Sequence, residues 1–446
     1  MIHTGDLRNL NQHHETFSGH RSRGRPRPVT VIGATPLRSD QPVGMFLPHQ
    51  QPYPIGEDVV DMAAHDVVGA CDPAFATVRD VLAAQLTDGR QLGAALAVRV
   101  GDREVVDIWG GHADPGRSRP WSADTVVNVW STTKGVVALA FHMLVDRGLL
   151  DPDQPVRKYW PEFTNDTVLV RHLLSHRAGL AAFRAPTTAE ELADWKLMIT
   201  RLADTQPWWE PGTASGYHAL TYGFLVGELI RRTTGNTVRD FLQHEVADRA
   251  GADFSIGLSP TDNRRAATLV QPPPEDPAAF QALFAQLNPV ALAVLTNPVV
   301  GPDQGNAAFW RAAEIPAANG HATARGVAAL YGAFAFGGVA GGQRLLGASQ
   351  VERAREGQGA CVDLVIGDAG LGGRESELGL GLWLSGEDGH YGPNPRAIGH
   401  DGFGGSFGLA DPEAGLAIGH VMNLMGTVIA DDPRKMELID AVYSCL

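Results

Sequence analysis

A serine and a lysine stand three residues apart in the stretch VVNVWSTTKGVVALAFHML, at Ser131 and Lys134. A helix-like apolar pattern begins at the serine, and side chains three residues apart lie on one face of a helix. A serine hydroxyl is a poor nucleophile until a base removes its proton. A neutral lysine amine can act as that base, whereas an arginine cannot lose its proton. The pair therefore predicts nucleophilic catalysis by Ser131 with Lys134 as its base.

The Ser-x-x-Lys spacing is weak evidence by itself, because two fixed positions in four often match by chance. It gains weight because lysine occupies only four of the 36 basic positions, and only Lys134 follows a serine at this spacing. The start of a helix also favours the chemistry. Its positive potential disfavours an ammonium and stabilises an oxyanion, and the backbone N–H of Ser131 is free there to act as an oxyanion donor.

The composition is that of a globular protein of 446 residues, 44% of them hydrophobic, with a formal net charge of −14. This length suits one large domain with an insertion, or two domains. The acidic charge argues against nucleic acid as a main partner, and no apolar run is long enough to span a bilayer. Three cysteines lie far apart in no metal or redox spacing. We therefore expect free thiols, a reducing compartment, and neither a metal nor a cofactor.

Residues 1–68 are expected to form a disordered or loosely attached extension. Arginines at 21, 23, 25 and 27 alternate with Ser, Gly and Pro, and no apolar segment typical of a secretory signal is present. We therefore expect a cytoplasmic protein, with export or association with the cell envelope left open. One interpretation is a basic arm that binds an acidic surface. We favour an extension without a fold, with Met45 or Met62 as an alternative start.

The rest of the chain, from about Asp72, predicts an α+β protein with an antiparallel sheet flanked by helices. We expect residues 69–150 and 317–446 to share this sheet, and residues 151–316 to form a second, mostly helical lobe. A cleft between two such lobes is a common place for a small-molecule site. The predicted elements, in chain order, are a helix over 73–86, a hairpin of 93–100 and 104–111, a helix over 131–149, a helix over 321–338, strands within 396–423, and a closing amphipathic helix over 430–446.

Five stretches in order resemble the serine β-lactamase and penicillin-recognising superfamily, and most of all its class C-like carboxylesterases of the family VIII type. The resemblance covers about residue 72 to the C-terminus and implies a β-lactamase/transpeptidase-like fold. The stretches are VVDIWGG, NVWSTTKG, VRHLLSHRAGL, WEPGTASGYHALTYGFLVGELI and GHDGFGGSFGLADPEAGLAIGHVMN.

This resemblance implies a role for each matching residue. Ser131 is the acylated nucleophile, Lys134 is its base partner, and Tyr217 shares protons with both and with the leaving group. A phenol beside a cation can act as a phenolate, which makes such a role for Tyr217 chemically reasonable. Without the resemblance, Tyr217 is an ordinary packing tyrosine after a Pro-Gly turn.

The stretch His400-Asp401-Gly402 stands where β-lactamases have a Lys-Thr-Gly strand. By resemblance, the backbone N–H of Phe403 is the second oxyanion donor, and His400 lies within reach of Tyr217 or the acyl group. Two departures count against an efficient β-lactamase. The triad Tyr-x-Asn is here Tyr217-His218-Ala219, and the lysine that binds a substrate carboxylate is replaced by His400.

Three further residues are candidates to line the substrate pocket. Asn319 precedes the late helix, His218 follows Tyr217, and Trp208 precedes a Pro-Gly turn. An ordinary packing role is the alternative for each. Trp208 in that case belongs to the core, and otherwise offers an apolar wall for an acyl chain.

Two motifs are set aside. Residues 404–408 spell Gly-x-Ser-x-Gly, but a nucleophile elbow needs a helix after its serine, and Ser406 is followed by a strand-like run. His172 and His176 are four apart, a spacing that can bind zinc, but no third ligand is apparent. We expect these histidines to cap or pack the helix end before Gly179.

These observations predict a metal-independent serine hydrolase that cleaves short to medium acyl esters through an acyl-enzyme on Ser131. Its partner is a small-molecule ester, and its oligomeric state stays open. The alternatives of the same fold are an amide-directed β-lactamase, a D-aminopeptidase or an acyltransferase. A non-turnover penicillin-binding protein is the alternative without steady catalysis.

Overall fold

The computed structural model describes residues 66–272, 282, 284–367, 371–426 and 431–446. The predicted N-terminal extension, residues 1–68, lies almost wholly outside the described residues and stays a prediction. The start of the folded part was expected near Asp72, and this is wrong by several residues. Val68–Cys71 form strand β1, which pairs with β3 along its whole length.

The predicted antiparallel sheet is confirmed, and it joins the two ends of the chain. Its seven strands have the order β1-β3-β2-β12-β11-β10-β9, and every neighbouring pair is antiparallel. The predicted hairpin and the terminal strands are all present. Beyond β1, the strands are β2 (Gly93–Val100), β3 (Arg103–Gly111), β9 (Trp383–Leu384), β10 (Ile398–Asp401), β11 (Phe407–Asp411) and β12 (Leu416–Met422).

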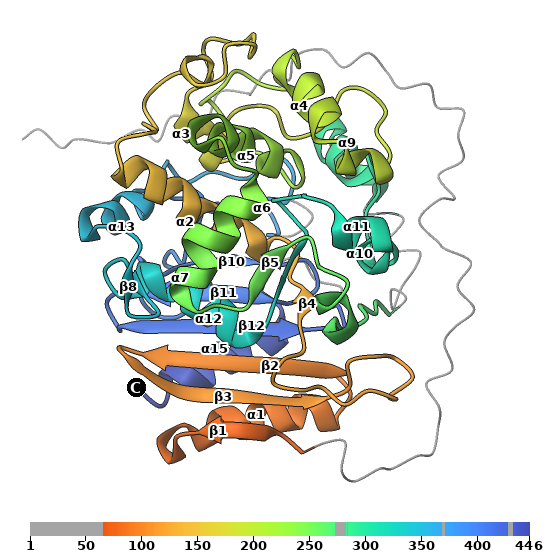
Figure 1. Cartoon of the computed structure of the whole chain (residues 1–446), viewed down its shortest axis with the longest axis vertical. Helices are drawn as coiled ribbons and strands as arrows, with labels where there is room; N and C mark the ends of the chain where they lie inside the picture. The colour runs from red at the N-terminus through yellow and green to blue at the C-terminus, as the bar shows by residue number, and fades with distance from the viewer. Residues whose placement is uncertain (1–65, 273–281, 283, 368–370, 427–430) are drawn as a thin grey trace, which may run out of the picture.

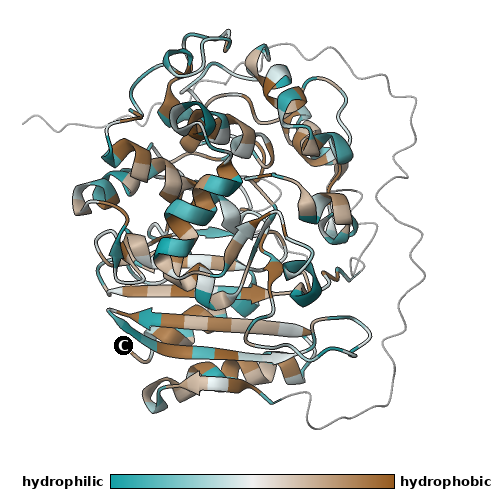
Figure 2. Cartoon of the chain, viewed as in Figure 1, coloured by the Kyte–Doolittle hydropathy of each residue, from teal (hydrophilic) through white to brown (hydrophobic). Residues whose placement is uncertain are grey.

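Helices cover both faces of this sheet (Figure 1). On one face, α12 (Ala324–Ala335) packs on the central strands, and α2 (Thr132–Asp146) packs on α12. On the other face, α1 (Ala76–Thr87) packs against α15 (Pro433–Tyr443). Figure 2 shows brown, hydrophobic residues along β2 and β12, as expected for strands covered on both faces.

The middle of the chain is mostly helical, as predicted. Two of its helices, α4 and α5, pack on each other, and α5 packs on α2. One hydrophobic core runs from the sheet into these helices, so the boundaries of a separate helical lobe stay a prediction. The elements are η3 (Val156–Lys158), α3 (Val170–Leu174), η4 (Glu190–Ala193), α4 (Trp195–Ala203), α5 (Thr221–Thr234), α6 (Val238–Phe241), η5 (Leu242–Ala247), α7 (Asp248–Ala250), η6 (Asp262–Arg265), α9 (Pro289–Thr296), α10 (Pro302–Asn306) and α11 (Ala308–Ala312).

A small second sheet was not predicted. It consists of β4 (Val127–Asn128), β6 (Gly320–Ala322) and β5 (Phe254–Ile256), with β6 in the middle. The helix predicted over 321–338 therefore begins later, at Ala324. The hydroxyl oxygen of Thr323 accepts a hydrogen bond from the N–H of Gly326 and so caps the start of this helix. The remaining elements are β7 (Val339–Ala340), β8 (Gln343–Arg344), α13 (Ala348–Ala354) and η2 (Pro73–Phe75).

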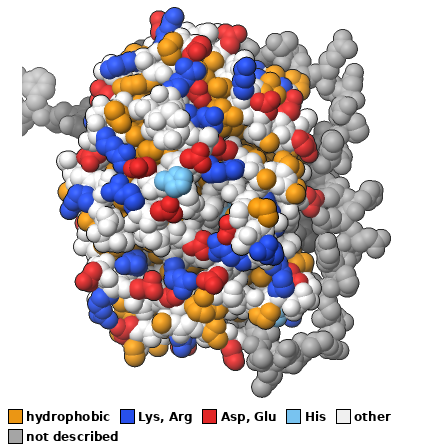
Figure 3. All heavy atoms as spheres, viewed as in Figure 1, with side chains coloured by type: hydrophobic (Ala, Val, Ile, Leu, Met, Phe, Trp, Pro, Cys, Tyr) orange, Lys and Arg blue, Asp and Glu red, His pale blue; other side chains and the backbone are white. Residues whose placement is uncertain are grey.

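On the face drawn in Figure 3, basic and acidic side chains are intermixed. Within the described ranges, no helix is long and apolar enough to cross a membrane.

The contact between α12 and the sheet depends on a glycine. A Cβ on Gly419 of β12 would lie 2.3 Å from the Ala324 carbonyl oxygen and 2.5 Å from the Ala328 nitrogen. Because both are backbone atoms, we expect Gly419→Ala to lower the free energy of unfolding by about 1–3 kcal/mol. Urea unfolding measures this change. In the control Gly116→Ala, the new Cβ meets only a carboxylate oxygen at 3.5 Å. Equal stability of the two variants would contradict the packing described here.

Candidate active site

The turn before α2 places Ser131 at the helix N-terminus. Trp130 has a φ of 46°, in the left-handed region that side chains rarely adopt. Its indole is buried and packs on Trp310, with ring centroids 5.5 Å apart. Such strain persists only where the surroundings hold it, and it is concentrated at functional sites. Ser131 follows as the N-cap residue of α2, as the sequence predicted.

Lys134 lies on the next turn of α2, fully buried, with its amine held by three oxygens. Nζ lies 2.9 Å from Ser131 Oγ, 2.8 Å from the Ala219 carbonyl oxygen and 2.9 Å from the Ala317 carbonyl oxygen. A carbonyl oxygen can only accept a hydrogen bond, so both hydrogens of a neutral amine are used there. The lone pair of the amine is then left facing the serine hydroxyl.

Burial also favours the neutral amine. It lowers the pKa of Lys134 well below the usual value of a lysine. The physical reason is that an ammonium loses its hydration inside the protein, and neutral carbonyl groups replace only part of it. Lys134 is thus held in the form that can accept the proton of Ser131.

Tyr217 stands over the lysine, with Nζ 4.8 Å from the centre of its ring. Burial raises the pKa of the Tyr217 phenol, and a hydrogen bond with the Ser131 side chain opposes this only in part. The phenolate form of Tyr217 that the sequence suggested is therefore disfavoured. It would need a cation beside it, and burial favours the neutral form of the neighbouring Lys134 amine. The arrangement suits a neutral phenol that passes protons on.

Two backbone N–H groups near Ser131 are free to bind an oxyanion. Among the described residues, neither the N–H of Ser131 nor that of Phe403 has a hydrogen-bond acceptor. Phe403 lies just after β10, and its half-exposed ring packs edge-on against Trp130, with centroids 5.7 Å apart. Gly402 allows this approach, because a Cβ there would lie 2.2 Å from the Val129 carbonyl oxygen.

His400 on β10 is buried and neutral. Its Nδ1 donates to the Asp401 carbonyl oxygen at 2.8 Å, and burial lowers its pKa to about 3. Its ring centre lies 6.1 Å from that of Tyr217. Nε2 is buried and has no partner in the described part of the chain, so it presents an unused lone pair. His400 therefore supplies an acceptor, and no fixed cation.

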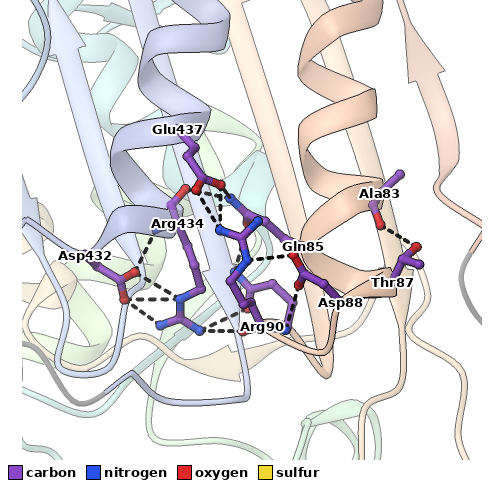
Figure 4. Close-up of polar contacts among 9 residues, drawn as sticks. Ala83, Gln85, Thr87, Asp88, Arg90, Asp432, Arg434 and Glu437 are labelled. Carbon is purple, nitrogen blue, oxygen red and sulfur yellow. Dashed lines mark hydrogen bonds and ion pairs between the residues drawn. The ribbon is translucent and has the colours of Figure 1, made fainter.

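The turn that carries Phe403 is anchored by two cations of α15, which the sequence did not point to. Lys435 Nζ lies 2.9 Å from the Asp401 carboxylate, and Arg434 Nη2 donates to the Gly404 carbonyl oxygen at 2.8 Å. Figure 4 shows the Arg434 guanidinium between the Asp432 carboxylate and the loop after α1. Both ends of the turn are thus fixed from the C-terminal helix.

Asn319 does not offer its amide to a substrate. It is fully buried, its Nδ2 donates to the carbonyls of Trp310 and Ala313, and its Oδ1 accepts the N–H of Ile315. These bonds hold the loop whose Ala317 carbonyl receives the lysine amine. Asn319 is therefore part of the frame of the site.

The other two candidates for the pocket lining are also buried. His218 Nε2 accepts the N–H of Leu180, and its Nδ1 donates to the Gly216 carbonyl, so both ring nitrogens are used. Trp208 is covered by Arg184, with the guanidinium carbon 3.5 Å from the ring centre. Trp208 belongs to a small apolar cluster that packs against Tyr217, so it lies behind the site.

The two motifs set aside have structural contacts. Ser406 precedes a strand, and its Oγ donates to the Val129 carbonyl oxygen at 2.9 Å. His172 Nδ1 accepts the N–H of Leu169 and so caps the start of α3, rather than the helix end before Gly179 as predicted. Within the residues that the structure describes, no group of His, Cys, Asp and Glu could hold a metal ion.

Several residues of the site were missed by the sequence analysis. The carbonyls of Ala219 and Ala317 are backbone atoms, which leave no mark on residue type. Asp363 is buried and accepts the N–H of Tyr217 at 3.0 Å and the hydroxyl of Ser215 at 3.0 Å. Its distance along the chain from Tyr217 gave no signal of this contact.

The chain is similar to known proteins over most of its length. The family model described as Beta-lactamase matches residues 78–441. The esterase/beta-lactamase LipL of Mycobacterium tuberculosis is 36% identical over 383 residues, which cover 83% of this chain and 86% of that protein.

Two solved structures are also similar over their whole length. A family VIII carboxylesterase has a TM-score of 0.79 and 39% identity, covering 85% of this chain and 100% of that one. A penicillin-binding protein homologue from Caulobacter crescentus has a TM-score of 0.79 and 38% identity, with the same coverage of 85% and 100%.

The buried amine generates a pH prediction. Ser131 should react with a fluorophosphonate only while Lys134 is neutral, so the rate should rise with pH through a midpoint well below that of a free lysine. Lys134→Arg should slow labelling about a hundred- to ten-thousand-fold at every pH, because a guanidinium stays protonated. Fluorophosphonate labelling of both proteins, stopped at set times over a range of pH, measures the midpoint and the loss of rate. A midpoint near that of free lysine, about 10.4, would count against the proposed base.

Proposed function

The chain belongs to the beta-lactamase family, and from this premise we propose that it is a carboxylesterase that cleaves short to medium acyl esters through an acyl-enzyme on Ser131. The observation that carries the proposal is the contact of the buried Lys134 amine with Ser131 Oγ. Both hydrogens of that amine are taken by carbonyls, so its lone pair is directed at the nucleophile.

Acylation begins when Ser131 Oγ attacks the ester carbonyl carbon and its proton moves to the Lys134 amine. The carbonyl oxygen becomes an oxyanion, which the N–H groups of Ser131 and Phe403 stabilise. Removing one such donor typically costs about a hundred- to a thousand-fold in rate. The bond to the alcohol oxygen then breaks, and that oxygen receives the proton from Lys134 through the Tyr217 phenol.

Deacylation repeats these steps with water as the nucleophile. Water attacks the acyl carbonyl carbon, and its proton passes to the Lys134 amine through Tyr217. The bond to Ser131 Oγ breaks, and the serine recovers a proton from the lysine. His400 Nε2 is buried without a partner among the described residues, and its ring centre lies 6.1 Å from that of Tyr217, so it is our candidate acceptor for a hydrogen bond from the entering water.

The charges around the site favour a neutral substrate. His400 is neutral where β-lactamases place a lysine, and Lys134 is neutral as the base. Lys435 and Arg434 are nearby cations, but each is bound to a carboxylate. The apolar rings of Trp130, the residue before the nucleophile, and of Phe403 pack edge-on against each other. A β-lactam, whose carboxylate needs a cation, gains less from this site than a neutral ester.

The names of relatives support an ester substrate and keep a second one open. The Mycobacterium tuberculosis relative is called both an esterase and a beta-lactamase, and one solved structure is called a carboxylesterase. β-Lactam hydrolysis, peptide or amide cleavage and acyl transfer also begin with attack of the serine on a carbonyl carbon, so they differ from the proposal in the acyl group, the leaving group or the final acceptor.

A series of p-nitrophenyl esters with increasing acyl length tests the proposal. We expect wild-type protein to release p-nitrophenol from short and medium chains. Ser131→Ala should lose at least about a thousand-fold in kcat, because the nucleophile is removed. Ser406→Ala, which removes the other candidate serine, should keep its activity. Activity that survives in Ser131→Ala would overturn the mechanism.

A chromogenic cephalosporin run in parallel separates the substrates. We expect its kcat/KM to be lower than that of the best ester. The opposite order would favour the β-lactamase alternative. Labelling of Ser131 without release of the acyl group would favour the non-turnover penicillin-binding protein.

A further inference from the structure

The segment that follows α3 runs alongside the loop that carries Tyr217. Three backbone hydrogen bonds join them: Trp208 N to Gly179 O at 2.7 Å, Gly212 N to Arg177 O at 2.9 Å, and Gly216 N to His176 O at 3.1 Å. The SHRAGL stretch thus forms one side of a frame for the loop. The zinc spacing and the packing role considered for its histidines do not explain this contact.

Three consecutive N–H groups of the Tyr217 loop are bound from outside the loop. Gly216 donates to the His176 carbonyl oxygen at 3.1 Å, Tyr217 to Asp363 Oδ1 at 3.0 Å, and His218 to His176 Nδ1 at 3.2 Å. Two of the three acceptors belong to His176. This residue therefore holds the backbone on both sides of the tyrosine.

The ring of His176 also touches the tyrosine directly. Its centre lies 4.7 Å from that of Tyr217 in an edge-to-face arrangement, and 5.3 Å from that of Tyr222. The ring is buried, and burial lowers the pKa of His176 well below its usual value. A neutral ring has a lone pair on Nδ1, which accepting the His218 N–H requires.

The backbone of His176 is strained in a way that suits this task. Its φ is 58°, in the left-handed region. A non-glycine residue there costs free energy and persists when surrounding contacts hold it. At this position the left-handed turn directs the carbonyl and the ring of one residue to neighbouring N–H groups of the same loop.

We propose that His176 is a positioning residue for Tyr217. Its carbonyl oxygen and Nδ1 hold the backbone of the tyrosine loop, and its ring packs against the phenol ring and limits where that ring can lie. The proposal rests on the role proposed above for Tyr217 in proton transfer. The same loop supplies the Ala219 carbonyl that binds the Lys134 amine. A shift of the loop would therefore displace the phenol and one support of the base together.

Two substitutions separate the acceptor from the backbone strain. His176→Gly removes the ring, and glycine adopts a φ of 58° without penalty, so the variant should fold. His176→Asn restores an acceptor, because Asn Oδ1 occupies nearly the place of His Nδ1, and asparagine also tolerates this conformation. We expect His176→Gly to lose about a hundred-fold in kcat with little change in KM, as for a misplacement of about 1 Å. His176→Asn should recover most of that loss.

The matched control is His172→Ala, four residues earlier on the same segment. His172 also accepts a backbone N–H, but from Leu169 within the capped helix. We expect its kcat to stay close to that of the wild type. Ester hydrolysis, the rate of fluorophosphonate labelling and thermal melting are measured on all four proteins.

The results distinguish this inference from the proposed function. If the wild type neither hydrolyses esters nor reacts with the fluorophosphonate, the proposed function fails. If the wild type is active and folded His176→Gly matches it, the inference fails. The inference also fails if folded His176→Asn is as slow as His176→Gly, because the acceptor then does not hold the loop. Should His176→Gly not fold, a kcat of His176→Asn near the wild-type value supports the inference, and a hundred-fold loss overturns it.

Discussion

The site depends on one buried lysine amine whose partners, among the residues that the structure describes, include carbonyl oxygens and no carboxylate. An ammonium moved into the protein interior loses several kcal/mol of hydration even after relaxation. A carboxylate partner would offset that loss and would keep Lys134 charged. Two carbonyls and a hydroxyl satisfy a neutral amine instead. Such partners favour the neutral form of Lys134, which the role proposed for it as the base of Ser131 requires.

The requirement for two carbonyls explains why three distant segments meet at the start of α2. One carbonyl comes from the loop before α5, where His176 and Asp363 bind the backbone. The other comes from the loop before β6, where Asn319 binds three backbone groups. Neither carbonyl could be supplied by α2 itself, because its own carbonyls point along the helix axis. The mostly helical part of the chain thus holds the carbonyl oxygens of Ala219 and Ala317 in contact with the Lys134 amine.

The oxyanion side of the site is held by different means. Here a turn after β10 must approach the N-terminus of α2 closely, and Gly402 permits it. Arg434 and Lys435 hold this turn from the far side of the sheet, each through a buried contact with a carboxylate or a carbonyl. Removing one partner of such a pair leaves a buried charge without compensation, which is costly. Helix α15 therefore contributes to the site by holding the turn that carries Phe403.

Much of this molecule follows from local sequence pattern. The hairpin, the nucleophile helix and the terminal strands have strong apolar periodicity, and each lies close to its predicted bounds. The short strands β1, β4 and β6 were missed or misplaced, because two to four residues carry too little periodicity to separate a strand from a loop or a helix end.

For the site, the sequence by itself determined which residue types stand at the proposed catalytic positions. A serine and a lysine on one helical face, a tyrosine after a Pro-Gly turn, and a His-x-Gly strand are all visible as residue types at set spacings. Only the tertiary structure decided the protonation states and the supports. The neutrality of Lys134 and His400 comes from burial, and the burial of His218 and Asn319 removes them from the substrate surface. The carbonyls of Ala219 and Ala317 are common to every residue type. Their position depends on long-range packing, which no local pattern records.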